Sequence, residues 1–215
     1  MSDGLFTSQK QIEDLKFDQD QQGNKTLRPG DIRYKDVNGD AKLDWKDQVE
    51  IGKGTMPHWM LGFNVNLRYK NFYTSSLWQG AMGYYSNVIL TYKVGNLMRP
   101  SIIYDLRWSE QNNVPDALEP RLGGAVTNDY TSDYRYKNAG YLRLKVFSIG
   151  YDLPAKLLEK ANIRQVKIYV AGTNLLTFDK LSKYGIDPEA PSGHMGATFY
   201  YPQQRTISFG ATISL

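Results

Sequence analysis

A twelve-residue run at positions 36–47, DVNGDAKLDWKD, places oxygen-bearing groups at the alternating positions of an EF-hand-type calcium loop. Such a loop takes ligands from positions 1, 3, 5, 7, 9 and 12, and position 7 contributes its backbone carbonyl. The six candidate ligands are Asp36, Asn38, Asp40, Lys42 through its carbonyl, Asp44 and Asp47. The spacing predicts a site for Ca²⁺, with Mg²⁺ as the alternative ion.

Two positions in this run depart from the usual pattern. Ala41 stands where Gly normally permits the sharp turn, and Asp47 is shorter than the usual bidentate Glu. Both changes favour a weaker site or one more tolerant of Mg²⁺. Pro29 upstream and Pro57 downstream oppose flanking helices, so the loop is expected to hold together an extended surface segment. The alternative is a solvated turn that binds nothing.

The composition limits the classes of protein to which the chain can belong. With 215 residues it is long enough for one or two domains with a sizeable core. The absence of Cys excludes a disulfide scaffold and thiolate chemistry. A net charge of +4 from scattered Lys and Arg does not point to nucleic acid. The only histidines, His58 and His194, lie far apart in the sequence, and catalytic motifs are absent, so we do not expect an enzyme.

Two segments alternate strictly between apolar and polar residues. In the segment 60–69 the apolar residues are Leu61, Phe63, Val65, Leu67 and Tyr69. In the segment 205–215 they are Ile207, Phe209, Ala211, Ile213 and Leu215. This period of two predicts strands with one apolar and one polar face. Each segment has about the 9–11 residues that a tilted strand needs to cross a bilayer, although soluble sandwiches alternate as well.

Three further strands are predicted between these two. They cover residues 72–85, 141–153 and 166–174. The first of them follows segment 60–69 after only Lys70 and Asn71, the length of a tight hairpin turn. The apolar phase of segment 141–153 switches near Val146, which predicts a bulge.

The connections between the predicted strands are very unequal in length. Two residues join the first pair, and a short segment opened by Pro154 joins the third strand to the fourth, whereas long stretches separate Tyr85 from Tyr141 and Thr173 from Thr206. Tyr and Trp crowd the strand ends, as at membrane interfaces or simply as good strand formers. We therefore predict an all-β antiparallel up-and-down meander of about five strands with long loops on one edge.

Five sequence blocks in order resemble the C-terminal part of SusC/RagA-type TonB-dependent outer-membrane transporters of Bacteroidota. The blocks are RPGDIRYKDVNGDAKLDWKDQVEIG, LGFNVNLRYKNFYTSSLWQGAMG, YLRLKVFSIGYDLP, AGTNLLTFDKLSKYGIDPEA and YPQQRTISFGATISL. This resemblance implies a barrel of about 22 strands, of which the chain is expected to be a C-terminal fragment. Residues 1–58 would be an external segment with the cation loop, and 59–215 the last strands with external loops 87–136 and 174–204.

The resemblance also implies a function. Such proteins import oligosaccharides or peptides across the outer membrane, take energy from TonB through an N-terminal part that this sequence lacks, and work with a SusD-like surface lipoprotein. The long loops would be extracellular, and lipid would contact the apolar strand faces. A fragment with open strand edges would not transport alone, because unpaired backbone groups are costly in lipid.

Two groups of residues are candidates for contact with a substrate or partner. In the first long loop these are Arg107, Trp108 and Asn112, with internal loop packing as the alternative role. On the expected lumenal face they are Asn64, Asn66, Arg68 and Gln79.

A secreted, soluble β-sandwich that binds calcium and carbohydrate is the competing interpretation. In a sandwich a second sheet would cover the apolar face, whereas a barrel segment would be one sheet with that face uncovered. A dockerin-like module would need a second copy of the calcium loop, which we do not find.

Overall fold

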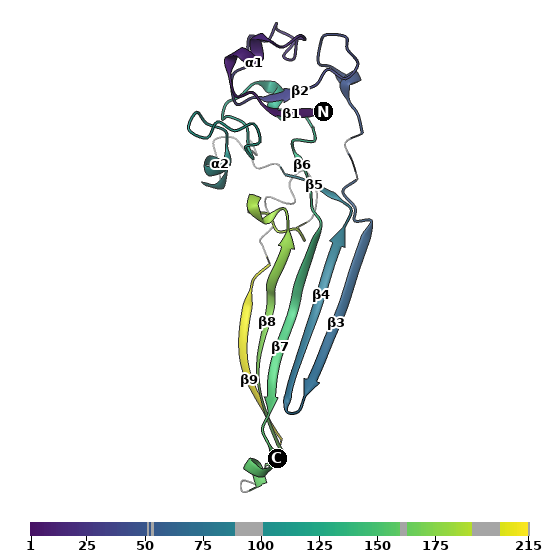
Figure 1. Ribbon diagram of the computed structural model, residues 1–215, viewed down its shortest axis with the longest axis vertical. Coiled ribbons are helices and arrows are strands. Elements are labelled where there is room, and N and C mark those ends of the chain that lie inside the picture. Colours follow the sequence, from purple (N-terminus) through teal and green to yellow (C-terminus); the bar gives the residue numbers. More distant parts are fainter. Residues whose placement is uncertain (51, 53, 89–100, 160–162, 191–202, 215) are drawn as a thin grey trace.

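The computed structural model describes residues 1–50, 52, 54–88, 101–159, 163–190 and 203–214. The molecule is elongated, with a sheet of long strands at one end and a loop-rich region at the other (Figure 1). We call this second region, residues 1–50 and 101–135, the loop module. In the described part of the chain, helices long and apolar enough to cross a membrane are absent.

The sheet is an antiparallel meander. Its strands are β3 (Trp59–Tyr69), β4 (Phe72–Met82), β7 (Tyr141–Asp152), β8 (Gln165–Asp179) and β9 (Thr206–Ser214). They lie in the order β3-β4-β7-β8-β9, so each long strand pairs with the next long strand along the chain. This order confirms the predicted up-and-down topology of five strands.

Short connections join two of the strand pairs at the end far from the loop module. Lys70 and Asn71 form the β3–β4 turn, and Lys70 takes the left-handed conformation with φ 52° that a two-residue hairpin requires. The β7–β8 connection contains the short helix α3 (Ala155–Leu158). Both connections lie near the C-terminal end of the chain (Figure 1).

The predicted bulge in β7 is present. The register of β4 against β7 shifts between Leu77, which pairs with Val146, and Trp78, which pairs with Leu144, so Lys145 is the extra residue. Because of this shift, Leu144 pairs with Trp78 and Phe147 pairs with Ser76 on the same side of the sheet. The bulge therefore keeps both apolar halves of β7 on one face.

Strand β8 is longer than the sequence predicted. We expected the second long loop to begin at residue 174, but β8 continues to Asp179. Asn174 adopts φ 52°, and beyond this irregularity Leu176 and Phe178 pair with Leu144 and Leu142. The gain of cross-strand pairing explains the extension. Residues 191–202 of the expected loop lie outside the described residues.

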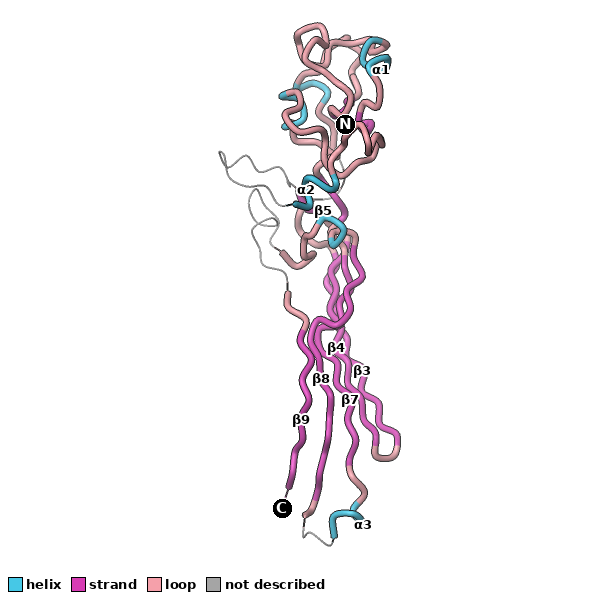
Figure 2. The backbone as a smooth tube through the Cα atoms, turned by 90° about the vertical axis from the view of Figure 1, so that its left-hand side faces the viewer, coloured by secondary structure: helices cyan, strands magenta, loops and turns pink. Residues whose placement is uncertain are grey.

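One face of the sheet is apolar and uncovered. Phe63 is 45% exposed, Ile207 62% and Phe209 81%. The register places Val170 and Ile149 on this face as neighbours of Phe209. Figure 2 shows the five strands as a single layer, without a second described sheet against them. This arrangement matches the barrel interpretation and not the sandwich. In water, each exposed apolar side chain would lose the stabilisation of about 1.5–3 kcal/mol that burial provides.

The loop module has small cores of its own. Strands β1 (Ser2–Leu5) and β2 (Ile32–Tyr34) pair near helix α1 (Gln9–Glu13). Helix α2 (Ser101–Leu106) and 3₁₀ turns at Trp45–Asp47 and Val126–Asp129 complete it. One cluster of buried side chains contains Leu5, Ile32, Tyr34, Leu43, Trp108, Ala117 and Tyr134. Residues of the first long loop, among them Trp108 and Tyr134, thus hold the N-terminal segment in place.

A two-stranded neck lies between the module and the sheet. Strands β5 (Tyr85–Asn87) and β6 (Tyr136–Asn138) pair across the base of the first long loop. Around the neck, a buried cluster includes Tyr84, Tyr141, Leu181 and Tyr184, the last from the 3₁₀ turn Ser182–Tyr184. The sequence pattern did not predict this neck, because three-residue strands carry almost no periodic signal.

Candidate functional site

Hydrogen bonds from backbone N–H groups to the Asp36 side chain stabilise a sharp turn in the candidate cation loop. The carboxylate of Asp36 accepts from the N–H of Gly39 at 2.7 Å and from that of Ala41 at 2.9 Å. Ala41 takes the left-handed conformation, φ 65°, at the position where calcium loops usually carry Gly. A residue with a Cβ therefore makes the turn that the motif requires.

The second half of the loop is fixed by a capping box. Asp44 accepts from the N–H of Lys46 at 2.7 Å, and Asp47 accepts from the N–H of Asp44 at 2.8 Å. Asp47 also accepts from the N–H of Val37, so it ties the two ends of the loop together. Burial raises the pKa of Asp47, but these backbone hydrogen bonds outweigh burial and the pKa lies below its ordinary value.

The loop has the backbone turn of a cation site, but its side-chain oxygens do not converge on one point. The side chain of Asn38 accepts from the N–H of Asp40, and Asp40 accepts from that of Lys42. Within the described residues, groups of three or more His, Asp or Glu side chains able to hold a metal ion are absent. The oxygens of Asp36, Asp40 and Asp47 lie along one loop and are directed at its backbone N–H groups.

A second polar loop, which the sequence reasoning missed, lies against the first. Asp18 and Lys42 form a parallel β-bridge. Asp20 accepts hydrogen bonds from the N–H groups of Gln22 and Asn24 and from the hydroxyl of Thr26 at 2.6 Å. Burial raises the pKa of Asp20, but the bonds from Thr26, Gln22 and Asn24 lower it from 3.8 to about 2. The alternation of Asp and Gln before Gly23 was the available signal.

The four candidate lumenal residues share the face opposite the apolar one. Gly62 pairs with Gln79 and Arg68 with Tyr73, which puts Asn64, Asn66, Arg68 and Gln79 on the same side of the sheet. Arg68 forms an ion pair with Asp152 at 2.6 Å. Gln79 donates to the hydroxyl of Tyr141 at 3.5 Å. The structure therefore brings these residues onto one polar wall.

Two tyrosines lie flat on that wall, and the sequence reasoning missed them. A Cβ on Gly150 would meet the Tyr73 ring at 2.3 Å, and one on Gly210 would meet the Tyr169 ring at 2.3 Å. The rings therefore fill the space above glycines on neighbouring strands. The signal for this packing is a Tyr paired with a Gly on the neighbouring strand, but such pairs can be recognised only when the strand register is known.

The three loop candidates lie close together but differ in exposure. Trp108 is buried, at 8% exposure; its ring packs on Gly30 and its indole N–H donates to Asn113 at 3.0 Å. The guanidinium of Arg107 lies 3.6 Å from the centre of the Tyr104 ring. Asn112 is exposed and donates to the carbonyl of Arg107. The Trp108 ring thus has a packing role here.

The chain is similar in sequence to TonB-dependent receptors. No family model matches it. It is 33% identical over 196 residues to TonB-dependent receptor P3 of Formosa agariphila, covering 85% of this chain and 19% of that receptor. TonB-dependent receptor SusC of Bacteroides thetaiotaomicron is 26% identical over 86% of the chain and 18% of the receptor. The chain thus spans about a fifth of the length of these relatives.

Solved structures share the fold. The RagAB peptide importer in its open-open state matches with a TM-score of 0.62 and 21% identity, over 100% of this chain and 22% of that chain. Its closed-closed state matches with a TM-score of 0.59 and 24% identity, over 83% and 20% of the two chains. The five-stranded meander with its two unlike faces is that of a β-barrel segment, and the chain belongs to the SusC/RagA-type TonB-dependent receptors.

Proposed function

We propose that this chain forms part of the wall of an outer-membrane nutrient importer driven by TonB. The observation that carries the proposal is the single sheet with an uncovered apolar face and a polar opposite face. Lipid covers the side of Phe63 and Phe209, and the side of Asn64 and Arg68 borders the lumen. The free edges of β3 and β9 pair with further strands of the receptor, because unpaired backbone groups are costly in lipid.

The orientation follows from the unequal connections. The Lys70–Asn71 turn and the α3 connection lie at one end of the sheet, and the loop module lies at the other (Figure 1). Outer-membrane barrels have short periplasmic turns and long extracellular loops. The loop module is therefore extracellular, where a SusD-like lipoprotein covers the entrance. TonB acts through the part of the receptor that precedes these strands.

The imported nutrient is an oligosaccharide or a peptide. Asn64, Asn66, Arg68 and Gln79 present amides and a guanidinium to a passing substrate, and Arg107 and Asn112 present donors at the loop surface. The structurally similar RagAB is an importer of peptides. Both substrate classes carry the hydroxyl, carbonyl or amide groups that such side chains bind.

Cell fractionation tests the location and a deletion strain tests the import. The tagged full receptor is expected in the outer-membrane fraction and is released only by detergent. Deletion of its gene should abolish growth on one oligosaccharide or peptide source and leave growth on free monosaccharides and amino acids unchanged. A receptor found in the soluble fraction would contradict the proposal, as would a deletion strain that grows normally on every polymeric source.

We further propose that loop 36–47 binds Ca²⁺ weakly, through Asp36, Asn38, Asp40, the Lys42 carbonyl, Asp44 and Asp47. The left-handed Ala41 and the capping box support this assignment. Ion binding requires the carboxylates to turn from the backbone N–H groups toward the ion, which favours a dissociation constant of about 0.1–1 mM.

Titration of the full receptor with Ca²⁺, followed by hydrogen exchange of the loop amides, tests the site. Protection should increase with Ca²⁺ in the natural receptor and in a Glu13→Ala control, whose carboxylate lies outside the loop. It should not increase in Asp36→Ala. Equal protection with and without the ion in all three proteins would refute a Ca²⁺ role, and Mg²⁺ gives the same comparison for the alternative ion.

A further inference from the structure

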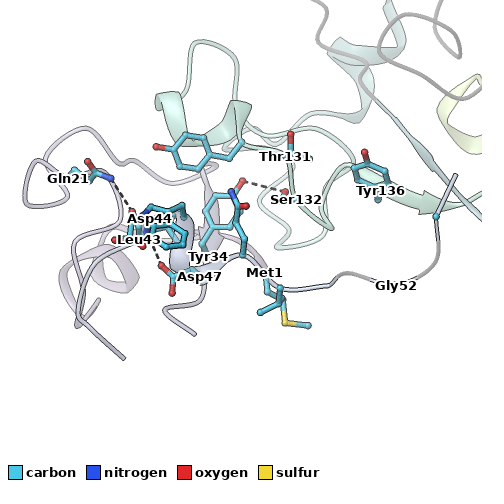
Figure 3. Close-up of a pocket in the computed structure, with 15 residues that line it drawn as sticks. Met1, Gln21, Tyr34, Leu43, Asp44, Asp47, Gly52, Thr131, Ser132 and Tyr136 are labelled. Carbon is cyan, nitrogen blue, oxygen red and sulfur yellow. Dashed lines mark hydrogen bonds between the residues drawn. The ribbon is translucent and has the colours of Figure 1, made fainter. Parts of the chain in front are cut away.

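A cavity of about 690 Å³ lies in the loop module between the candidate cation loop and residues 130–136. Its size falls within the range of about 300–1,000 Å³ that is typical of small-molecule sites. Figure 3 shows residues from distant parts of the sequence around it, among them Gln21, Tyr34, Asp44 and Ser132.

Aromatic rings form its apolar surface. Trp45 is 74% exposed and Tyr130 41% exposed, whereas Tyr34 is buried at 4% and forms the floor. The rings of Tyr34 and Tyr130 lie 6.2 Å apart between centroids, at an angle of 38°. The exposed rings of Trp45 and Tyr130 leave flat apolar surface open to a ligand.

The surrounding hydrogen bonds hold the Tyr34 ring and the backbone of Trp45 in place. The Tyr34 hydroxyl donates to the carbonyl of Thr127 at 3.1 Å and lies 3.4 Å from the Ser132 hydroxyl. Trp45 begins the 3₁₀ turn whose capping box joins Asp44 and Asp47. A ligand therefore meets an ordered Tyr34 ring and a fixed backbone at Trp45, which lowers the entropic cost of binding.

The polar lining favours a neutral ligand. Gln21, Asp44 and Gln48 line the cavity beside the rings. Among the described lining residues, the side chains include no Lys, Arg or His, whereas Asp44 and Asp47 are acidic, which disfavours an anionic ligand. Both carboxylate oxygens of Asp47 already accept from backbone N–H groups. The amides of Gln21 and Gln48 are suited to neutral hydroxyl groups.

We propose that this cavity binds a short neutral oligosaccharide. A pyranose has an apolar face of C–H groups that packs on an aromatic ring, and equatorial hydroxyls that bond to amides and carboxylates at its edge. Trp45 and Tyr130 supply the rings, and the amides of Gln21 and Gln48 supply the polar partners. The inference rests on the proposed import function and narrows its substrate to neutral glycans captured at the loop module.

Binding of an oligosaccharide array to the full receptor, purified from outer membranes in detergent, tests the proposal. The array contains hexasaccharides of glucose, xylose and mannose as neutral probes and hexagalacturonate as the anionic probe. At least one neutral probe should bind, and more tightly than hexagalacturonate. Trp45→Ala and Tyr130→Ala should each weaken that binding at least tenfold. Tyr104→Ala removes an aromatic ring, 65% exposed, that does not line the cavity, and it should leave affinity unchanged.

Two outcomes would overturn the inference. One is the absence of binding to every neutral probe; the other is binding that survives both Trp45→Ala and Tyr130→Ala. Neither outcome touches the import function, because that is read from the growth of the deletion strain and from fractionation. A receptor that supports growth on peptides but binds none of the neutral sugars would keep the importer assignment and exclude the glycan site.

Discussion

The most demanding test of the loop module is the replacement of Asp31 by Ala. This carboxylate is fully buried and joins the early chain to residues more than 90 positions later. It accepts hydrogen bonds from the N–H groups of Arg28 and Ala125, the Asn128 amide and two nitrogens of Arg121. One side chain therefore holds three segments of the module together.

The expected cost follows from what remains after the carboxylate is removed. The Arg121 side chain is 24% exposed and can turn toward water, so its charge is not trapped. The N–H of Ala125 and the amide of Asn128 stay buried, and each unsatisfied donor costs about 1–3 kcal/mol. With the lost ion pair, we expect the module to be destabilised by about 3–5 kcal/mol.

Hydrogen exchange of the full receptor measures this cost locally, since the barrel can survive when the module opens. The reporters are the N–H of Phe6, which donates to the Asp31 carbonyl, and the N–H of Ile32, which donates to Asn128. Asp31→Ala should raise the opening constant at both amides about 100- to 4,000-fold, because 1.4 kcal/mol corresponds to a factor of ten.

The matched control is Asp3→Ala. Asp3 pairs with Arg33 at the surface and is 44% exposed, so its loss should cost less than about 1 kcal/mol. If exchange at Phe6 and Ile32 were equally fast in both variants, Asp31 would not be the residue that joins these segments, and the reasoning from buried donors would fail.

Three other changes probe the sheet and the polar loops. Gly150→Ala places a methyl group against the Tyr73 ring and should cost about 1–3 kcal/mol, seen as a lower temperature of barrel unfolding on gels; adding Tyr73→Ala should restore stability. Phe209→Arg on the apolar face should cost up to about 2–4 kcal/mol and reduce outer-membrane abundance, whereas Ser208→Arg on the polar face should have little effect; equal losses would contradict the assignment of faces. Because the pKa of Asp20 is lowered from 3.8 to about 2, its contribution is present above pH 3.8 and is lost between pH 3.8 and 2. Exchange in residues 20–26, corrected for intrinsic rates, should rise only in that window.

The sheet was largely predictable because its information is local. A strand exposes alternate residues to opposite faces, so Leu61, Phe63, Ile207 and Phe209 define a face without knowledge of the partner strand. The phase change near Val146 likewise predicts the bulge that the β7 register contains. The Lys70–Asn71 turn followed from the distance between two alternating segments.

The loop module was not predictable, since its structure depends on contacts between distant residues. Trp108 was a candidate for ligand contact, but it packs on Gly30, 78 positions earlier by their numbers. The extension of β8 past Asn174 depended on pairing with β7. Trp45 and Tyr130 line the same cavity, but the sequence around each of them does not indicate that the two lie close together. Sequence alone determined which residues could form strands and which face was apolar, because backbone geometry sets that period; tertiary packing decided which rings were buried and which remained open to a ligand.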